Sequence, residues 1–219
     1  MFRTIASREN NPVHIMTQIN ELACRNNKEN IFVTLFIGVL DLPTGHLRFC
    51  NAGHEKPILI KRKRTEGASP DERTIDCQML DIKPNLPIGL FDDFQYEAQE
   101  ITLKRGDTLF LYTDGLTEAR NMANELFGEK RVMQMLTDCN TTVPKQLLDN
   151  TTNQLNRFTE GAEQSDDLTL LIFNYTPEEE REVLDEELVL QNDVRQVEQL
   201  NTFMKQSLQR LNIEKPLIN

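Results

Sequence analysis

Residues 106–115 run Gly106-Asp107-Thr108-Leu109-Phe110-Leu111-Tyr112-Thr113-Asp114-Gly115, an apolar stretch between two acidic, glycine-containing turns. A short apolar run that is rich in aromatic side chains and bounded by turn residues is typical of a buried β-strand. We therefore expect a turn at residues 104–107, a buried strand over residues 108–113, and an aspartate delivered at the end of that strand.

A second acidic cluster lies some fifty residues later, where Asp166 and Asp167 precede a predicted strand over residues 168–175. Carboxylates at strand ends are held by rigid backbone, and they are hard oxygen donors that suit Mg²⁺ or Mn²⁺ better than thiolate-seeking metals. The two clusters together indicate a shared metal site. The residues alone leave an alternative open, because Asp-Gly is a common turn signal and Asp166-Asp167 could cap a turn.

The remaining pattern places helices and strands in a mixed order. Apolar residues at helical spacing behind a possible Asn11 cap predict a first helix, and β-branched runs on either side of a turn predict a hairpin. The predicted helices cover residues 12–26, 127–136 and 143–158; the other predicted strands cover residues 31–40, 46–50, 57–61 and 97–103, with a surface loop over residues 62–72. This order favours an α+β fold with helices packed on sheet.

Composition excludes several classes of function. The 219 residues carry a net charge of -11, which argues against general affinity for nucleic acid or anionic membrane. We therefore expect the basic run Lys61–Arg64 to be a solvated surface feature. No apolar stretch is long enough to span a membrane, and the first residues lack the apolar core of a signal peptide, so the sequence indicates a cytoplasmic chain. The four cysteines are scattered and are assigned no chemistry.

The composition changes near residue 177. Residues 177–187 contain seven acidic residues and one arginine, which predicts a linker or domain boundary. A strand at residues 187–190 and an amphipathic helix with an apolar stripe from Val194 to Leu211 are expected beyond it, and the stripe is a candidate homodimer surface. We expect a main domain over residues 1–176 and an acidic linker with a strand-helix tail over residues 177–219, too small to form a core alone.

Six segments follow one another as they do in SpoIIE/RsbU-type serine/threonine phosphatases, the type 2C-like branch of the metal-dependent protein phosphatases. They are Phe32–Asp41 with Thr44-Gly45, then Asn51-Ala52-Gly53-His54, Leu86-Pro87-Ile88-Gly89-Leu90, Gly106–Arg120, Glu125-Leu126-Phe127-Gly128 and Gln164-Ser165-Asp166-Asp167-Leu168-Thr169. Over residues 1–175 the chain therefore resembles this family.

The resemblance implies a four-layer αββα fold, a β-sandwich flanked by helices, with Mg²⁺ or Mn²⁺ ions at its edge. In the family, a metal-bound water attacks a phosphoserine or phosphothreonine. The implied metal-site residues are Asp114 and Gly115 in one segment and Asp166 in the other, with Asp167 as its competitor.

Asn51 and His54 are the candidate catalytic residues. The imidazole of His54 could donate a proton to the leaving alkoxide or orient the phosphate. The alternative is that a histidine after glycine in a tight turn serves only the backbone.

One element of the family pattern is not found. The family uses a Gly-Asp-x-x-Gly-His-Gly-like segment, followed by a helix, whose aspartate bridges the two metals; this chain begins with what resembles the middle of that helix. We therefore expect an N-terminal piece to be missing, the fold to be incomplete there, and activity to be low. Sensor or membrane-anchoring segments would precede the missing piece.

The resemblance also implies a partner. Phosphatases of this branch act on a phosphorylated STAS-type anti-sigma-factor antagonist, and that is the expected substrate. The residues from about Glu186 resemble the first strand and helix of an anti-sigma-type ATPase domain without its ATP-binding motifs. The alternative function is a non-catalytic regulatory or binding module that keeps the phosphatase scaffold.

Overall fold

The computed structural model describes residues 9–25, 27, 29, 31–64, 73–163 and 166–177. The chain divides into two units, residues 1–177 and 178–219. The predicted C-terminal strand, helix and apolar stripe lie outside the described residues. The first unit contains α2 (Pro12–Arg25), β1 (Leu35–Leu40), β2 (His46–Ala52), β3 (Ile58–Arg64), β4 (Arg73–Met79), β5 (Gln99–Thr102), β6 (Thr108–Tyr112), α3 (Asp114–Thr117), α4 (Gly128–Cys139), α5 (Pro144–Phe158) and β7 (Leu170–Asn174).

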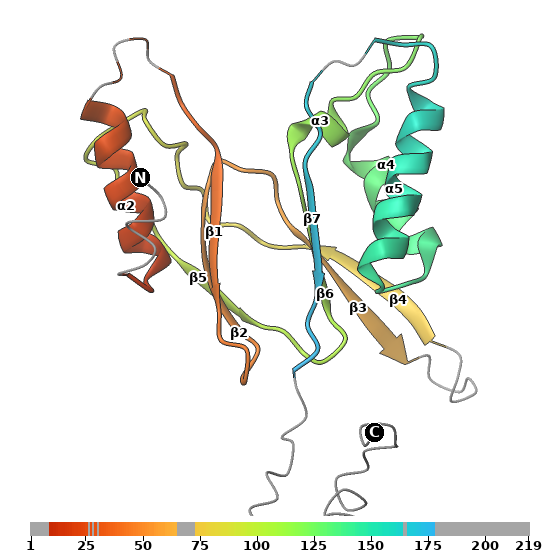
Figure 1. Cartoon of the computed structure of the whole chain (residues 1–219), viewed down its shortest axis with the longest axis horizontal. Helices are drawn as coiled ribbons and strands as arrows, with labels where there is room; N and C mark the ends of the chain where they lie inside the picture. Colours follow the sequence, from red (N-terminus) through yellow and green to blue (C-terminus); the bar gives the residue numbers. More distant parts are fainter. Residues whose placement is uncertain are drawn as a thin grey trace, which may run out of the picture. The chain divides into compact units, whose positions relative to one another are not determined.

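The strands form two antiparallel sheets. One has the order β1-β2-β5 and the other the order β4-β3-β6-β7. Figure 1 shows α2 beside the first sheet and the pair α4 and α5 along the second. The chain thus folds with helices on the outside and two sheets within.

Three apolar clusters hold these layers together. Ile15, Met16 and Ile19 of α2 pack on Ile37, Cys50 and Ala52 of the first sheet. Leu47 and Phe49 pack against Leu59, Leu109 and Leu111 between the sheets, and Ile58, Ile60 and Phe110 face the apolar stripes of α4 and α5. Since neighbouring strand residues point to opposite faces, each sheet buries both of its faces. The predicted α+β fold and its αββα layering are confirmed.

Most predicted elements are present with shifted ends. The first helix begins behind Asn11, whose Oδ1 accepts a hydrogen bond from the Val13 amide at 3.1 Å, as the cap prediction requires. The predicted hairpin is β1 and β2, joined through residues 41–45. Among the described residues, no helix is both long and apolar enough to pass through a membrane.

The predicted loop over residues 62–72 is wrong at its start, because β3 continues to Arg64 and the basic run therefore lies in a strand. Its partner β4 had not been predicted. The register Ile58↔Met79 to Arg64↔Arg73 pairs the two strands along their whole length. Ile75, Cys77 and Met79 of β4 contact the core and alternate with polar residues, a period-2 pattern that could have predicted this strand from the sequence.

Two of the resemblance segments pack against each other beside α2. Gly53 has a φ of +70° and a Cβ there would lie 2.6 Å from Pro87 Cγ, so this close approach requires glycine. The fully buried Asn20 of α2 fixes the other side of the same loop: its Oδ1 accepts from the Gly89 amide at 2.8 Å, and its Nδ2 donates to the Phe91 carbonyl at 2.7 Å. The loop that Asn20 holds in place therefore packs against the loop that carries His54.

Candidate metal centre

Asp114 stands at the point where β6 passes into the short helix α3. Thr113 is the extended N-cap residue, and the Asp114 carbonyl accepts hydrogen bonds from the Glu118 amide at 2.7 Å and from Thr117 Oγ1 at 3.2 Å. Asp114-Gly115 is therefore the first turn of a helix, not a hairpin turn. The backbone of Asp114 is fixed while its side chain is exposed.

The second acidic segment is tied to the same strand end. The Thr113 amide donates to the Thr169 carbonyl at 3.1 Å, and the Thr113 hydroxyl both accepts from the Thr169 amide at 3.0 Å and donates to the Asp167 carbonyl at 3.2 Å. These bonds extend the β6–β7 ladder beyond its last pair, Tyr112↔Leu170. One threonine thus anchors both acidic segments.

Gly115 makes the approach of the two segments possible. A Cβ at this position would lie 2.3 Å from the Asp167 carbonyl oxygen, too close for any other residue without a backbone shift. Gly115 has no side-chain donor atom. Its observed role is to let the Asp167 backbone pack closely against the start of α3. The carboxylate of Asp166 is oriented by its own loop, because Oδ1 accepts from the Asp167 amide at 2.7 Å.

Asn51 and His54 lie across from these segments. Asn51 is buried, its Oδ1 accepts from the His54 amide at 2.7 Å, and its Nδ2 donates to the His54 carbonyl at 2.9 Å. Both ends of the amide are used to shape the loop, which makes Asn51 a positioning residue. Burial lowers the pKa of the His54 imidazole, and the nearby Asp114 carboxylate partly opposes that shift.

Three further acidic residues surround the same region and were not assigned by sequence reasoning. Burial raises the pKa of Glu55, and the negative charges of Glu129, Asp114 and Glu118 raise it further. The only signal in the sequence was position: Glu55 directly follows the Asn51–His54 segment, and Glu129 follows Gly128. The field at this end of the sandwich is strongly negative, which favours a bound cation.

Tyr112 lies beneath these acids. Its side chain is almost fully buried, and within the described residues its hydroxyl has no hydrogen-bond partner. Burial raises the pKa of this hydroxyl, with smaller contributions from Glu55 and Glu129. A neutral donor therefore faces the acidic region from the core.

The donor atoms of the described residues are of the type that a hard divalent cation prefers, but too few of them lie close together. Carboxylate and carbonyl oxygens are the ligands that Mg²⁺ and Mn²⁺ prefer. In the described part of the chain, however, no three His, Cys, Asp or Glu side chains lie close enough together to hold an ion. Asp114 and the Asp166-Asp167 segment therefore offer oxygen donors of the right type, and their role as metal ligands stays a prediction.

Comparison with known proteins gives a consistent match. The family model described as Stage II sporulation protein E (SpoIIE) matches residues 1–176. Protein IcfG of Synechocystis is 31% identical over 150 residues, 68% of this chain and 22% of that protein. Phosphoserine phosphatase RsbU of Bacillus subtilis is 24% identical over 110 residues, 50% of this chain and 29% of that protein.

A solved structure shares the fold. The crystal structure of the RsbU and RsbW domains of Rv1364c from Mycobacterium tuberculosis has a TM-score of 0.62 and 19% identity, and the match covers 97% of this chain and 54% of that one. The chain spans less than a third of the length of the two relatives above.

The packing of Gly115 predicts the effect of Gly115→Ala. Alanine has a higher helix propensity than glycine, so in the absence of a clash the substitution would stabilise α3. We expect instead a loss of about 1–3 kcal/mol in the free energy of unfolding, because the new methyl meets a backbone carbonyl. Urea denaturation measures this change.

Gly38→Ala is the matched control. A Cβ at Gly38 would lie 3.0 Å from Leu47 Cδ1 and 3.3 Å from Phe36 Cε1, so it would meet side-chain atoms at longer distances instead of a backbone carbonyl. Gly38→Ala should lower the free energy of unfolding less than Gly115→Ala does. A Gly115→Ala chain as stable as the wild type would contradict the proposed contact between the two acidic segments.

The environment of His54 predicts a pH dependence. Its pKa is lowered from the ordinary value of 6.5 in the folded state, so the unfolded chain binds more protons just below that value. Acidification from about pH 7 to about pH 5.5 should therefore cost stability. His54→Gln should flatten this part of the pH profile in metal-free protein, measured by urea denaturation at each pH. An unchanged slope would show that His54 is not buried as described.

Proposed function

The chain belongs to the SpoIIE family, and on that premise we propose that it is a metal-dependent protein serine/threonine phosphatase domain. The observation that carries the proposal is the junction at Gly115, where the Asp114 segment and the Asp167 segment are held in backbone contact. Carboxylates that are far apart in sequence are brought to one end of a rigid sandwich, the arrangement that a hard-metal site requires.

We assign the residues of the centre the following roles in metal binding. Asp114 and Asp166 hold the metal, Mn²⁺ or Mg²⁺, with Asp167 as the alternative to Asp166 and with Gly115 setting their spacing. The bound metal supplies an activated water and neutralises charge on the phosphoryl oxygens. The remaining coordination positions are left for water, for substrate oxygens or for ligands beyond the described residues.

His54 is suited to a role at the phosphate. Its imidazole is half-buried, and the Asn51 amide fixes the loop that carries it. A neutral imidazole can accept or donate one hydrogen bond, and in its protonated form it can give a proton to the departing serine or threonine oxygen. Asp114 favours the protonated form, so the same carboxylate would serve the metal and the proton donor.

The proposed substrate is the phosphorylated side chain of a STAS-type anti-sigma-factor antagonist. RsbU, a sequence relative, is a phosphoserine phosphatase, and the solved relative unites RsbU and RsbW domains in one chain. Both support a function in sigma-factor regulation. A phosphorylated signalling protein as substrate would place the domain in the cytoplasm. We further propose that residues 1–176 form the phosphatase domain, that residues 177–219 begin an ATPase-like domain, and that the protein is a homodimer.

One observation favours a second function. Because the described residues supply fewer than three clustered ligands, metal affinity should be weak and turnover by this chain low. A scaffold in that condition could recognise a phosphorylated partner without hydrolysing it. The two functions differ in one measurable property, the dependence of phosphate release on metal.

Manganese titration tests the metal assignment. We expect Asp114→Asn and Asp166→Asn each to weaken Mn²⁺ binding at least about tenfold, because each removes one charged oxygen ligand. Asp167→Asn should have the smaller effect. Binding is followed by calorimetry on the 219-residue chain, and Mn²⁺-dependent phosphate release from a phosphoserine peptide is measured on the same samples.

Asp149→Asn is the control, because Asp149 lies on α5 and pairs with Lys145 at 3.5 Å. Its affinity for Mn²⁺ should equal that of the wild type. Equal affinity in all four variants would remove the metal assignment. Binding that depends on Asp114 without any phosphate release would favour the non-catalytic module.

A further inference from the structure

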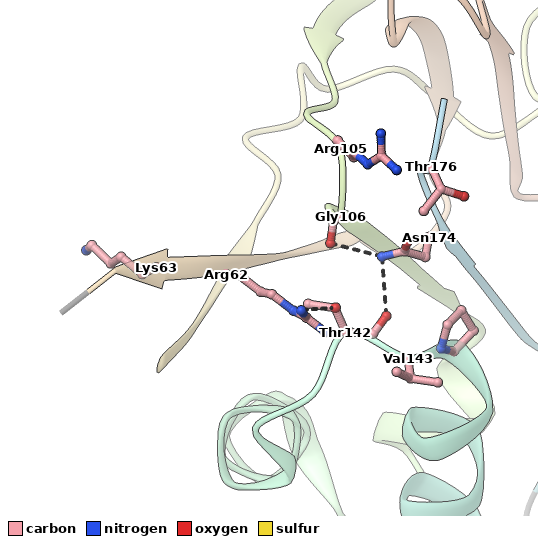
Figure 2. Close-up of a pocket in the computed structure, with 9 residues that line it drawn as sticks. Arg62, Lys63, Arg105, Gly106, Thr142, Val143, Asn174 and Thr176 are labelled. Carbon is pink, nitrogen blue, oxygen red and sulfur yellow. Dashed lines mark hydrogen bonds between the residues drawn. The ribbon is translucent and has the colours of Figure 1, made fainter. Parts of the chain in front are cut away.

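A second site lies at the other end of the four-stranded sheet. A cavity of about 870 Å³ opens there between the end of β3, the turn before β6, the α4–α5 connection and the end of β7 (Figure 2). Because β6 runs from this end to Asp114, the length of the strand, roughly 15 Å, separates the cavity from the candidate metal centre. The cavity therefore does not belong to that centre.

The floor of the cavity is built by hydrogen bonds. The side-chain amide of Asn174 donates to the Gly106 carbonyl at 2.9 Å and to Thr108 Oγ1 at 2.8 Å, with a longer contact to the Thr142 carbonyl at 3.4 Å. The Thr108 hydroxyl donates to the same Thr142 carbonyl at 2.7 Å. Figure 2 shows Asn174 between Gly106 and Thr142. One side chain thus joins β6, β7 and the α4–α5 connection into a rigid base.

Arginines stand on two sides of this base. Arg62 extends the helix-facing row of β3, and its Nε donates to Thr142 Oγ1 at 3.0 Å, which fixes the direction of the guanidinium. Arg105 comes from the turn before β6 and lines the same cavity, and Figure 2 shows its side chain away from that of Arg62. Lys63 is on the rim, where it pairs with Asp76 at 3.9 Å. The two arginines come from different segments and line the same cavity.

The charge of the cavity opposes the charge of the molecule. The chain has a net charge of -11, yet none of the nine described lining residues is acidic and three are basic. Positive side chains that line one cavity favour the entry of an anion over that of a cation. The planar guanidinium of arginine pairs with phosphate through two parallel hydrogen bonds.

The size of the cavity indicates what carries the phosphate. Pockets for small organic ligands measure about 300–1,000 Å³, and 870 Å³ lies in that range. An inorganic phosphate ion would fill only part of the space. Val143 and Pro144 add an apolar side against which the body of a ligand could pack.

We infer that this cavity, at the Arg62–Arg105 end of the sheet, binds a small phosphate-bearing molecule of about nucleotide size. The arginines hold the phosphate group, and the side formed by Val143 and Pro144 contacts the rest of the molecule. The inference does not depend on the proposed phosphatase activity, because no residue of the metal centre takes part in it.

The test is a titration of the ¹⁵N-labelled 219-residue chain, followed by NMR, with inorganic phosphate and with adenosine 5′-monophosphate. Saturable shifts are expected at the amides of Gly106, Thr142 and Asn174. We expect Arg105→Glu and Arg62→Gln each to weaken binding at least about tenfold, since each removes a charge-assisted contact. Lys130→Glu, an exposed change of the same charge on α4, should bind as the wild type does.

The outcomes separate the sources of the phosphate. Tighter binding of adenosine monophosphate than of inorganic phosphate identifies a phosphate carried on a larger body and supports the inference; equal or tighter binding of inorganic phosphate identifies the free ion and overturns the contact with a larger body. Absence of saturable shifts at these amides, or equal affinities in the arginine variants, would overturn the inference. Arg105→Glu changes an exposed turn residue, so its thermal unfolding curve serves as the check on folding.

Discussion

The contact between Gly115 and the Asp167 carbonyl is the constraint on which the candidate centre depends. Two acidic segments that are about fifty residues apart meet at one strand end, and the absence of a side chain at Gly115 allows them to approach. Thr113 strengthens the contact with hydrogen bonds to both Asp167 and Thr169. The sandwich supplies rigidity, because β6, which leads into the junction, has every one of its residues buried. The position of the acids is therefore a property of the core and not of a loose loop.

The same sheet separates two opposite electrostatic environments. At the Asp114 end, the acids near Glu55 favour a cation, whereas at the Gly106 end the arginines favour an anion. Strand β6 connects the two ends. The turn with Arg105 precedes it, and the candidate metal-site segment at Asp114 follows it.

Sequence reasoning succeeded where the signal was local. The apolar run before Asp114 and its bounding turns predicted β6, and the family resemblance predicted the αββα layering. It failed where the signal was not local. Strand β4 was missed although its residues alternate between polar and apolar, because the charged residues before it read as a loop; its pairing with β3 identifies it. Glu55 acquires its environment from Glu129 and Glu118, which are distant in sequence. Asn20 resembles an ordinary helix residue, and its bonds to the Gly89 loop are tertiary. The assignments of Asp114, Gly115, Asp166, Asp167, Asn51 and His54 remain predictions.

Paramagnetic broadening of backbone amide signals by bound manganese tests most directly whether a metal binds at the Gly115–Asp167 contact. Mn²⁺ broadens nearby amides strongly and distant ones little. We expect substoichiometric Mn²⁺ to broaden first the amides of Asp114, Gly115, Asp167 and Leu168, then that of His54, and to leave those of Gly106 and Asn174 sharp. Broadening that begins elsewhere, or that spares the amides on either side of the Gly115–Asp167 contact, would contradict a metal centre at this junction.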